Sequence, residues 1–327
     1  MSLFQPKNIA YGIATVVILS MAALALTIAL GAPKPIAAMD SINSPFKNVD
    51  NSALPSAQRY KARDGAALAY RHYMANPVAN EAFKNRRIVL IHGSSASSRS
   101  MHTVAQALSK AGYVVDALDM RGHGDSGVRG HIVYIGQLED DVTDFMRAVP
   151  YTGPNTLLGF SAGAGFTLRY SASAQAALFD RYLLLAPFLI QAPTNRPNSG
   201  GWASVGIPRI VALTILNRFG ITRWNNLTVT QFALNDEAKK FLTPTYSFAL
   251  STNFGAHLDY VQDIAKAAPK LKLIAGTDDE LMYSDRYADL FTKAGKTIPI
   301  TLVPATNHIG LTLNAPAVAA IAAAAKD

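Results

Sequence analysis

The chain of 327 residues contains no cysteine. A disulfide framework, thiolate catalysis and cysteine-ligated metal or iron–sulfur sites are therefore excluded. Charge is also scarce, because only 16% of the residues are Asp, Glu, Lys or Arg, against about 25% in typical soluble domains. Half of the residues are hydrophobic, a composition that argues against intrinsic disorder and is sufficient for a large buried core.

Acidic residues are the scarcer charged class. The chain has 22 of them against 30 Lys and Arg, which gives a net charge of +8. A basic balance is typical of proteins that bind nucleic acid or an anionic membrane surface. Because Lys and Arg are dispersed rather than gathered in a block, we expect no nucleic-acid partner. The sequence leaves the oligomeric state open.

The longest stretch without charge lies at the N-terminus. No charged residue occurs between Lys7 and Lys34, and residues 9–32 are almost wholly apolar. A helix of about 20 apolar residues spans the hydrocarbon core of a bilayer, whereas the apolar region of a cleaved signal is usually shorter, roughly 7–15 residues. We therefore predict an uncleaved membrane anchor at 1–32. A cleaved secretory signal is the alternative, since small residues such as Ala37 and Ala38 follow the run.

The side of the membrane is harder to predict. Lys7 precedes the apolar run, and Lys34 and Lys47 follow it. On the positive-inside rule this balance does not favour translocation of the body. Leading apolar segments with short N-terminal flanks nevertheless usually act as export signals. We expect a membrane-anchored protein with its body on the periplasmic or extracellular face, or a secreted one if the segment is cleaved.

The rest of the chain alternates between strand-like and helix-like segments. Residues 33–59 are rich in Pro, Ser and Asn and predict a linker. Beyond them, apolar runs alternating with amphipathic ones indicate a mostly parallel sheet covered on both faces. The strand-like runs are 88–91, 114–118, 155–159, 181–185, 272–275 and 298–303, and the helix-like runs are 100–111, 135–149 and 162–172. Residues 60–73 predict an antiparallel hairpin that turns at Asp64-Gly65.

One region, 188–255, breaks this alternation and contains no clear strand. We interpret it as a helical cap inserted between two parts of the core, at 60–187 and 256–327. Within it, residues 208–219 begin with Pro and are followed by Gly220, as helix termini prefer. Apolar residues surround most of this predicted helix, so we expect it to pack on another element or to lie over a pocket.

A G-x-S-x-G motif follows the apolar run that ends near Leu158. Its members are Gly159, Ser161 and Gly163, and a helix-like stretch comes directly after them. A sharp strand-to-helix turn exposes the serine side chain, and glycines two residues before and after leave room for the backbone to pass. The motif therefore predicts Ser161 as a catalytic nucleophile.

A serine nucleophile needs a base and an acid that orients the base. His308 follows the last strand-like run, and Asp278 and Asp279 follow the run 271–275. Loops at the carboxyl ends of strands are where a doubly wound sheet presents functional groups. We therefore predict His308 as the base. Either aspartate could be the acid, and we favour Asp279.

In its chain order of Ser161, Asp279 and His308, the sequence resembles the α/β-hydrolase superfamily from about residue 60 onward. Residues 91–95 (IHGSS) resemble the His-Gly turn after the third strand of that family, and 121–126 (RGHGDS) resemble a turn of its monoacylglycerol-lipase and lysophospholipase branch. We interpret His123 and Asp125 in this turn as buried structural groups. The resemblance implies an α/β fold with a doubly wound, mostly parallel eight-stranded sheet and a cap.

The resemblance also implies an activity. The backbone N–H groups of Ser94 and Ala162 would form an oxyanion hole, and no metal or organic cofactor would be needed. The expected reaction is hydrolysis of carboxylic esters through an acyl-enzyme. The apolar cap helix and the anchor suggest a lipid or monoacylglycerol-like ester. An acyltransferase or peptidase with the same triad, or a membrane-tethered binding module without catalysis, are the alternatives.

Overall fold

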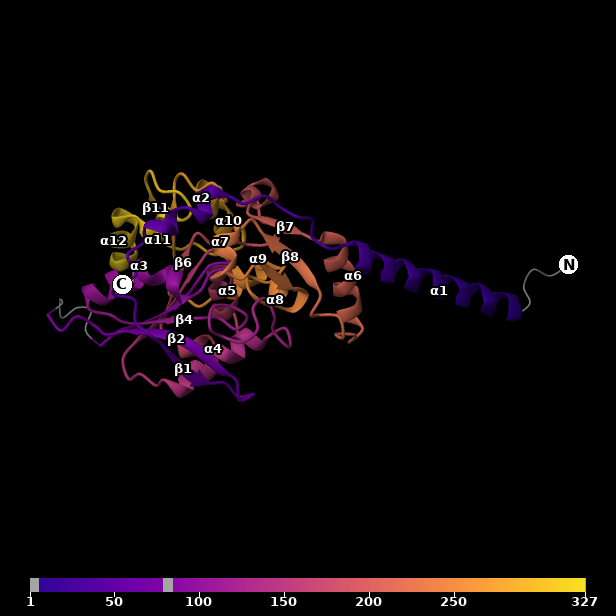
Figure 1. Cartoon of the computed structure of the whole chain (residues 1–327), viewed down its shortest axis with the longest axis horizontal. Helices are drawn as coiled ribbons and strands as arrows, with labels where there is room; N and C mark the ends of the chain where they lie inside the picture. Colours follow the sequence, from indigo (N-terminus) through magenta and orange to yellow (C-terminus); the bar gives the residue numbers. More distant parts are fainter. Residues whose placement is uncertain (1–5, 79–84, 327) are drawn as a thin grey trace.

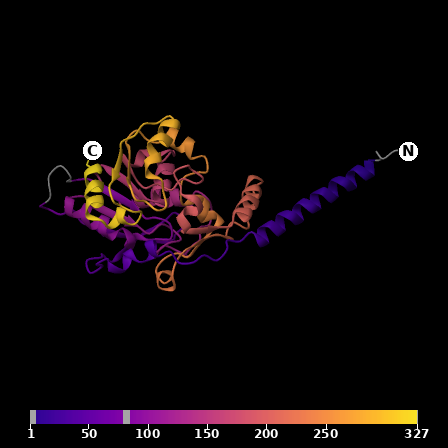
Figure 2. The same cartoon turned by 90° about the horizontal axis from the view of Figure 1, so that it is seen from above.

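The computed structural model describes residues 6–78 and 85–326. The long helix α1 (Pro6–Leu30) projects from the body of the molecule, as Figure 1 and Figure 2 show from two directions. Its residues Ala10–Leu30 have a mean hydropathy of 2.5, and the body buries none of that window. In length and composition α1 fits a membrane anchor, and an N-terminal signal sequence has the same properties.

The body is built on one eight-stranded sheet, which confirms the predicted α/β architecture. The strand order is β1-β2-β4-β3-β5-β6-β10-β11, and only the pairings made by β2 are antiparallel. The predicted hairpin at Asp64-Gly65 forms the antiparallel edge. The strands are β1 (Ala57–Lys61), β2 (Ala67–Tyr73), β3 (Arg87–Ile91), β4 (Val114–Leu118), β5 (Asn155–Phe160), β6 (Arg181–Leu185), β10 (Leu271–Gly276) and β11 (Ile300–Val303).

Helices cover both faces of this sheet, because its central strands are apolar on both sides. All five residues of β3 are buried, as a strand between two helical layers requires. One layer contains α3 (His102–Ala111) packed on α12 (Ala315–Ala324), and another group contains α4 (Gln137–Ala148), α5 (Ala162–Ser171) and α9 (Tyr260–Lys266). The short helix α10 (Tyr287–Lys293) lies between β10 and β11 in the chain, and α11 (Gly310–Leu313) precedes α12.

The cap differs from the prediction, because it contains strands. Between β6 and α9 the chain forms β7 (Ala203–Val205), α6 (Ile207–Arg218), β8 (Thr228–Phe232), α7 (Asp236–Lys239), β9 (Thr245–Ser247) and α8 (Phe248–Asn253). The three strands form an antiparallel sheet with β8 in the centre. The expectation of a strand-free cap was wrong because these strands are short and rich in Thr, Ser and Gln. Pairing with distant segments, rather than a strong apolar run, stabilises them. The helix α6 agrees with the predicted one.

The segment predicted as a linker is an ordered part of the body. It forms α2 (Asp40–Asn43) and the 3₁₀ turn η1 (Pro45–Asn48) before β1 begins. Asn43 is buried, and its side-chain Nδ2 donates a hydrogen bond of 2.8 Å to the carbonyl oxygen of Ala233 in the cap. Its Oδ1 accepts one of 3.2 Å from the backbone N–H of Asn235. The side-chain amide of Asn43 thus pairs with one backbone acceptor and one backbone donor of the cap. These hydrogen bonds attach the segment to the cap, so it is not a free linker between α1 and the core.

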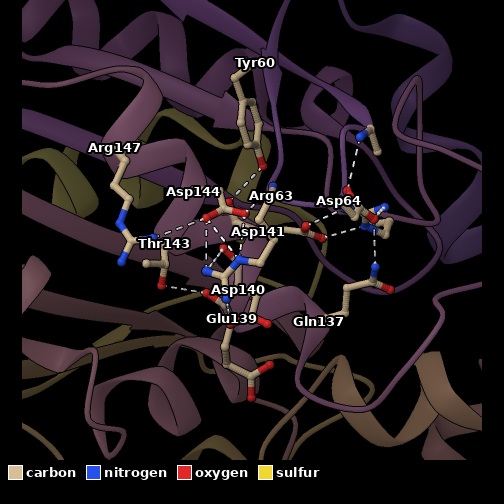
Figure 3. A network of polar contacts seen from close by, with 12 residues as sticks. Tyr60, Arg63, Asp64, Gln137, Glu139, Asp140, Asp141, Thr143, Asp144 and Arg147 are labelled. Atoms are coloured by element: carbon tan, nitrogen blue, oxygen red, sulfur yellow. Dashed lines mark hydrogen bonds and ion pairs between the residues drawn. The ribbon is translucent and has the colours of Figure 1, made fainter.

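A network of carboxylates and arginines ties the β1–β2 hairpin to α4 (Figure 3). Arg121 contacts both oxygens of Asp141, at 2.8 Å from Nε and 2.7 Å from Nη2, and its Nη1 lies 2.9 Å from Asp64 in the hairpin turn. Arg121 and Asp141 are both buried. Burial alone would raise the pKa of Asp64, but the hydrogen bonds and charge of Arg121 outweigh it and lower that pKa.

We expect Arg121→Met to lower the free energy of unfolding by about 3–5 kcal/mol, because it leaves the buried Asp141 carboxylate without its counter-charge. Urea unfolding at neutral pH measures this loss. The matched control is Arg147→Met, since the Arg147 side chain is 72% exposed and its Nη1 lies 3.7 Å from Asp144. For the control we expect a change below about 1 kcal/mol. Equal losses in the two variants would contradict the role assigned to Arg121.

This network should also make stability depend on pH. The pKa of Asp64 is lowered in the folded chain. The pKa of Asp144 is lowered as well, because hydrogen bonds from Arg63 outweigh the opposing effect of burial. A carboxyl group whose folded pKa is lowered contributes stability above its unfolded pKa and loses it as the pH falls through the folded value. The stabilisation by these two aspartates is therefore lost on the acid side, whereas burial raises the pKa of Asp141 and gives that carboxyl group the opposite pH dependence.

Candidate active site

Ser161 occupies a tight turn between β5 and α5. Its backbone has φ 54° and ψ −117°, a conformation that is costly for any residue other than glycine and that clusters at functional sites. A Cβ atom on Gly159 would lie 2.1 Å from the carbonyl oxygen of Gly163, and one on Gly163 would lie 2.2 Å from that of His92. Both motif positions therefore require glycine, as the sequence predicts for a serine raised at a strand end.

The structure brings the three predicted side chains together at the carboxyl ends of β5, β10 and β11. The Oγ of Ser161 lies 3.0 Å from Nε2 of His308, and Nδ1 of His308 lies 2.7 Å from Oδ2 of Asp279. All three residues are buried. The other oxygen of Asp279, Oδ1, accepts hydrogen bonds from the backbone N–H groups of Leu281 at 2.8 Å and Met282 at 2.9 Å.

Only one of the two candidate aspartates reaches the histidine. Asp278 is exposed, and its Oδ1 accepts a hydrogen bond of 2.9 Å from the hydroxyl group of Thr277. Burial alone would raise the pKa of Asp279, but the charge and hydrogen bond of His308 and two backbone N–H groups lower it. Asp279 is therefore an ionised carboxylate at neutral pH, and it faces His308 rather than solvent.

Three further residues, which were not predicted from the sequence, contact His308 or Ser94. Oε2 of Glu280 accepts a hydrogen bond of 2.9 Å from the backbone N–H of His308. The ring of Phe160 lies 4.8 Å from the imidazole of His308. Nε1 of Trp202 donates a hydrogen bond of 2.9 Å to Oγ of Ser94. Glu280 and Phe160 are sequence neighbours of predicted residues, whereas Trp202 belongs to the cap and has no local signal.

The two predicted oxyanion residues lie beside the serine. Ser94 lines the same cavity as Ser161, and Ala162 is the first residue of α5. Among the hydrogen bonds of the described residues, none uses the backbone N–H of Ser94 or Ala162 as its donor. The backbone N–H of Ala162 lies at the N-terminus of α5, next to the nucleophile, and Ser94 lies in the turn after β3. Two such N–H donors beside a nucleophile have the chemistry that stabilises a developing oxyanion.

A cavity of about 370 Å³ opens onto Ser161 and His308. Its volume lies within the range of small-molecule sites, roughly 300–1,000 Å³. Three parts of the chain line it: the core, the cap and the segment after α1. Its apolar lining includes Met101 and Phe160 from the core, Phe241 and Leu242 from the cap, and Ile42 and Phe46 from that segment. Such a lining suits an aliphatic or aromatic group of a ligand.

Two other histidines lie behind the site in neutral form. The backbone N–H of Met120 donates to Nε2 of His92 at 3.2 Å, so the Nδ1–H of His92 donates to the carbonyl oxygen of Gly93 at 2.8 Å. Burial lowers the pKa of His92 and, more strongly, that of His123. His123 is buried, consistent with a structural role. Asp125 is exposed, so the expectation that it is buried was wrong.

Within residues 6–78 and 85–326, no group of three or more His, Asp or Glu side chains lies close enough together to hold a metal ion. The expected independence from metals and organic cofactors stays a prediction.

Comparison with protein families shows to which family the chain belongs. The family model of serine aminopeptidase S33 matches residues 84–309, more than half of the chain, a range that contains Ser161, Asp279 and His308. The chain belongs to this family. It is therefore a hydrolase with the α/β-hydrolase fold, as the motifs predicted.

A curated relative shares part of the sequence. The monoacylglycerol lipase of Mycolicibacterium smegmatis is 40% identical over 91 residues, which are 26% of this chain and 32% of that protein. The chain thus aligns with about a third of the length of this relative.

Solved structures share the fold over a much larger part of this chain than the 91 residues aligned with that relative. A soluble variant of monoglyceride lipase from Saccharomyces cerevisiae is 18% identical with a TM-score of 0.62, and the match covers 86% of this chain and 97% of that one. Monoacylglycerol lipase from Paleococcus ferrophilus is 17% identical with a TM-score of 0.56, over 79% and 99% of the chains. A membrane phospholipase A is 15% identical with a TM-score of 0.54, over 97% of both chains.

Proposed function

We propose that this protein is a serine esterase in which Ser161 is the nucleophile, His308 the general base and Asp279 the acid that orients it. The observation that supports this most is the continuous line of hydrogen bonds from Asp279 through His308 to Ser161, at 2.7 and 3.0 Å. These distances are within reach of proton transfer. The line ends in an apolar cavity, where a substrate carbonyl group could meet the serine.

In the proposed reaction, Nε2 of His308 accepts the Ser161 proton while Oγ attacks the ester carbonyl carbon. The backbone N–H groups of Ser94 and Ala162 donate to the oxyanion, and each such donor stabilises the transition state by about 3 kcal/mol. The tetrahedral intermediate collapses to an acyl-enzyme as His308 protonates the leaving alcohol. Water then attacks the acyl carbon, His308 accepts its proton, and the acid leaves as Ser161 recovers its hydrogen.

The substrate proposed is a lipid ester of the monoacylglycerol type. Support comes from the apolar lining of the cavity and from the names of the relatives from M. smegmatis, S. cerevisiae and P. ferrophilus. The family name suggests peptides as the competing substrate class. Glu237, the acidic residue among the described residues that line the cavity, is paired with Lys240 at 2.6 Å. The cavity thus offers little to attract the ammonium group of a peptide N-terminus, which favours the ester.

Attachment to a membrane through α1 is part of the proposal. Support comes from the length of its apolar window and from the exposure of that window to the outside of the protein. The placement of the body on the periplasmic or extracellular face stays a prediction from the sequence.

We expect kcat/KM for nitrophenyl esters to rise as the acyl chain lengthens from acetyl through butyryl to octanoyl. Each buried CH₂ group contributes about 0.8 kcal/mol, equivalent to about fourfold in kcat/KM while the chain still fits the cavity. The assay uses the full chain in detergent micelles below the solubility limit of each ester, with Ser161→Ala as the background. A steep preference for acetyl would contradict a lipid substrate and leave ester hydrolysis standing. Hydrolysis of aminoacyl nitroanilides alone would contradict both.

A further inference from the structure

The cap helix α6 carries apolar side chains on its exposed side. Ile207, Val211, Ile215 and Phe219 are 56%, 52%, 42% and 78% exposed. They follow one another at intervals of four residues, three of them within α6 and Phe219 directly after its last residue, and they form a row along the helix, which we call the cap stripe. On the other side, Ala212, Leu213 and Leu216 are buried. An exposed row of large apolar residues on a folded protein usually marks an interaction surface.

The end of α1 packs on this same helix. Leu24 and Ile28 of α1 contact the small buried cluster that contains Leu213 and Leu216 of α6. Arg209 of α6 donates from Nε to the carbonyl oxygen of Ile28 at 2.7 Å and from Nη2 to that of Ala29 at 3.0 Å. These carbonyls lie in the last turn of α1, where helical partners are missing. The guanidinium group of Arg209 therefore provides hydrogen-bond donors for two carbonyl groups at the end of α1, and it joins this end to the cap.

Two glycines permit the close approach at this joint. A Cβ atom on Gly31 would lie 2.6 Å from the backbone nitrogen of Arg209, and one on Gly206 would lie 2.4 Å from the carbonyl oxygen of Gly31. Nη1 of Arg209 also donates to the carbonyl oxygen of Thr228 in β8, at 2.8 Å. The joint thus involves the start of α6 and the central strand of the cap sheet.

The point at which α6 contacts α1 determines how deep α6 would lie in a bilayer that α1 crosses. The apolar window Ala10–Leu30 has 21 residues and is about 32 Å long, close to the hydrocarbon thickness of about 30 Å. Leu24 and Ile28 precede the end of α1 by about 9 and 3 Å at ~1.5 Å per residue. Both views show α6 running across the direction of α1, at the end of the body from which α1 leaves (Figure 1, Figure 2). A bilayer crossed by α1 would therefore meet α6 lying along its surface.

The charge and aromatic pattern around the stripe fits this position. No acidic residue occurs from Arg181 to Asn235 in the sequence. Arg218 and Arg223 are exposed, and Trp224 is 41% exposed. Interfacial helices combine an apolar side with Lys or Arg and with aromatic residues at headgroup depth, and they bind anionic lipids through the basic groups.

We propose that the cap stripe is a membrane-docking surface, which lies about 5–10 Å deep in the headgroup region of the bilayer that α1 crosses. The inference rests on the proposed anchoring by α1 and adds a second, separate attachment through the cap. Because the cap also supplies Trp202 and Phe241 to the catalytic cavity, docking would hold that cavity at the lipid surface. The occupant proposed is the lipid bilayer, rather than a second copy of the chain.

The absence of cysteine makes a direct test simple, because one introduced thiol can be labelled uniquely. The full chain is reconstituted in vesicles of phosphatidylcholine and phosphatidylglycerol with an environment-sensitive fluorophore at one position. Ile215→Cys and Phe219→Cys report on the stripe, and Val17→Cys reports on α1. Leu178→Cys is the matched apolar control, because Leu178 is 36% exposed and precedes β6, at the end of the strand away from the site.

We expect quenching by brominated lipids at Val17, Ile215 and Phe219 to exceed that at Leu178 by at least about twofold, as burial to headgroup depth predicts. Strong quenching at Val17 with none at Ile215 and Phe219 would overturn the docking surface and leave the anchor intact. Loss of quenching at Val17 as well would refute the anchoring itself. Labels at Ile215 and Phe219 that are shielded from water yet not quenched by lipid would point to a second protein copy and also overturn the proposal.

Discussion

Replacing the serine in Ser161→Ala should lower kcat for an activated ester by about 10⁶-fold, because the attacking oxygen is lost while His308 and the oxyanion donors remain. The fold should survive this change. Alanine keeps the Cβ atom that the strained turn at φ 54° already accommodates, and the lost hydroxyl group makes one hydrogen bond, to His308. We therefore expect thermal unfolding within a few degrees of the wild type, so a loss of activity would report chemistry rather than folding.

Covalent labelling by a fluorophosphonate probe, detected on a gel, tests the same role of Ser161. The wild-type chain should label and Ser161→Ala should not. Ser100→Ala is the matched control, since Ser100 lines the same cavity and its hydroxyl group donates only to the carbonyl oxygen of Ser97, at 2.7 Å. We expect its labelling to match the wild type. A folded wild-type chain that never labels would instead support a membrane-tethered binding module without catalysis.

The core of this candidate site could be predicted from sequence because each proposed catalytic residue follows a strand of the parallel sheet. Strands such as β3 are buried along their whole length, and the four residues after Arg87 form a continuous apolar run. Parallel strands end at one edge, so residues that follow different strands meet there, however far apart they are in the chain. Ser161 and His308 are 147 positions apart and their side chains are in hydrogen-bonding contact.

The strands of the cap and the contacts of the segment after α1 escaped prediction for the opposite reason. Their contacts join distant parts of the chain that have no periodic pattern of their own. Trp202 reaches Ser94 across 108 positions, and Asn43 reaches Ala233 across 190. A Pro- and Asn-rich stretch reads as a linker unless the partner of each polar group is known. Here the side-chain amide of Asn43 makes hydrogen bonds to the cap. Ile42 and Phe46, which are near it in the sequence, line the cavity.

This arrangement places part of the N-terminal segment in the wall of the cavity. Ile42 and Phe46 lie beyond Ala38, so they would remain in the chain whether α1 stays as an anchor or is removed as a signal. The cavity wall would thus be the same in a membrane-bound and a secreted form. What differs is the joint between Arg209 and the end of α1, which only the anchored form retains. Access to a lipid surface, rather than the chemistry, should then distinguish the two forms.

The substitution Asp279→Asn should lower kcat by about 10⁴-fold through the tautomer of His308. Oδ1 of Asp279 accepts hydrogen bonds from the backbone N–H groups of Leu281 and Met282. An asparagine there must place its carbonyl oxygen at the same position, so its NH₂ group faces Nδ1 of His308. Nδ1 would then act as an acceptor and the proton would reside on Nε2. That nitrogen could no longer take the proton of Ser161.

The matched control is Asp278→Asn, because Asp278 is exposed and its carboxylate accepts from Thr277 instead of His308. We expect its kcat to stay within about twofold of the wild type, as for a change at an exposed side chain that does not hydrogen-bond to His308. Steady-state kinetics on one soluble ester, with circular dichroism to confirm folding, separates the two variants. The reverse result, a large loss in Asp278→Asn and a small one in Asp279→Asn, would assign the acid to Asp278 and require the loop after β10 to rearrange before catalysis.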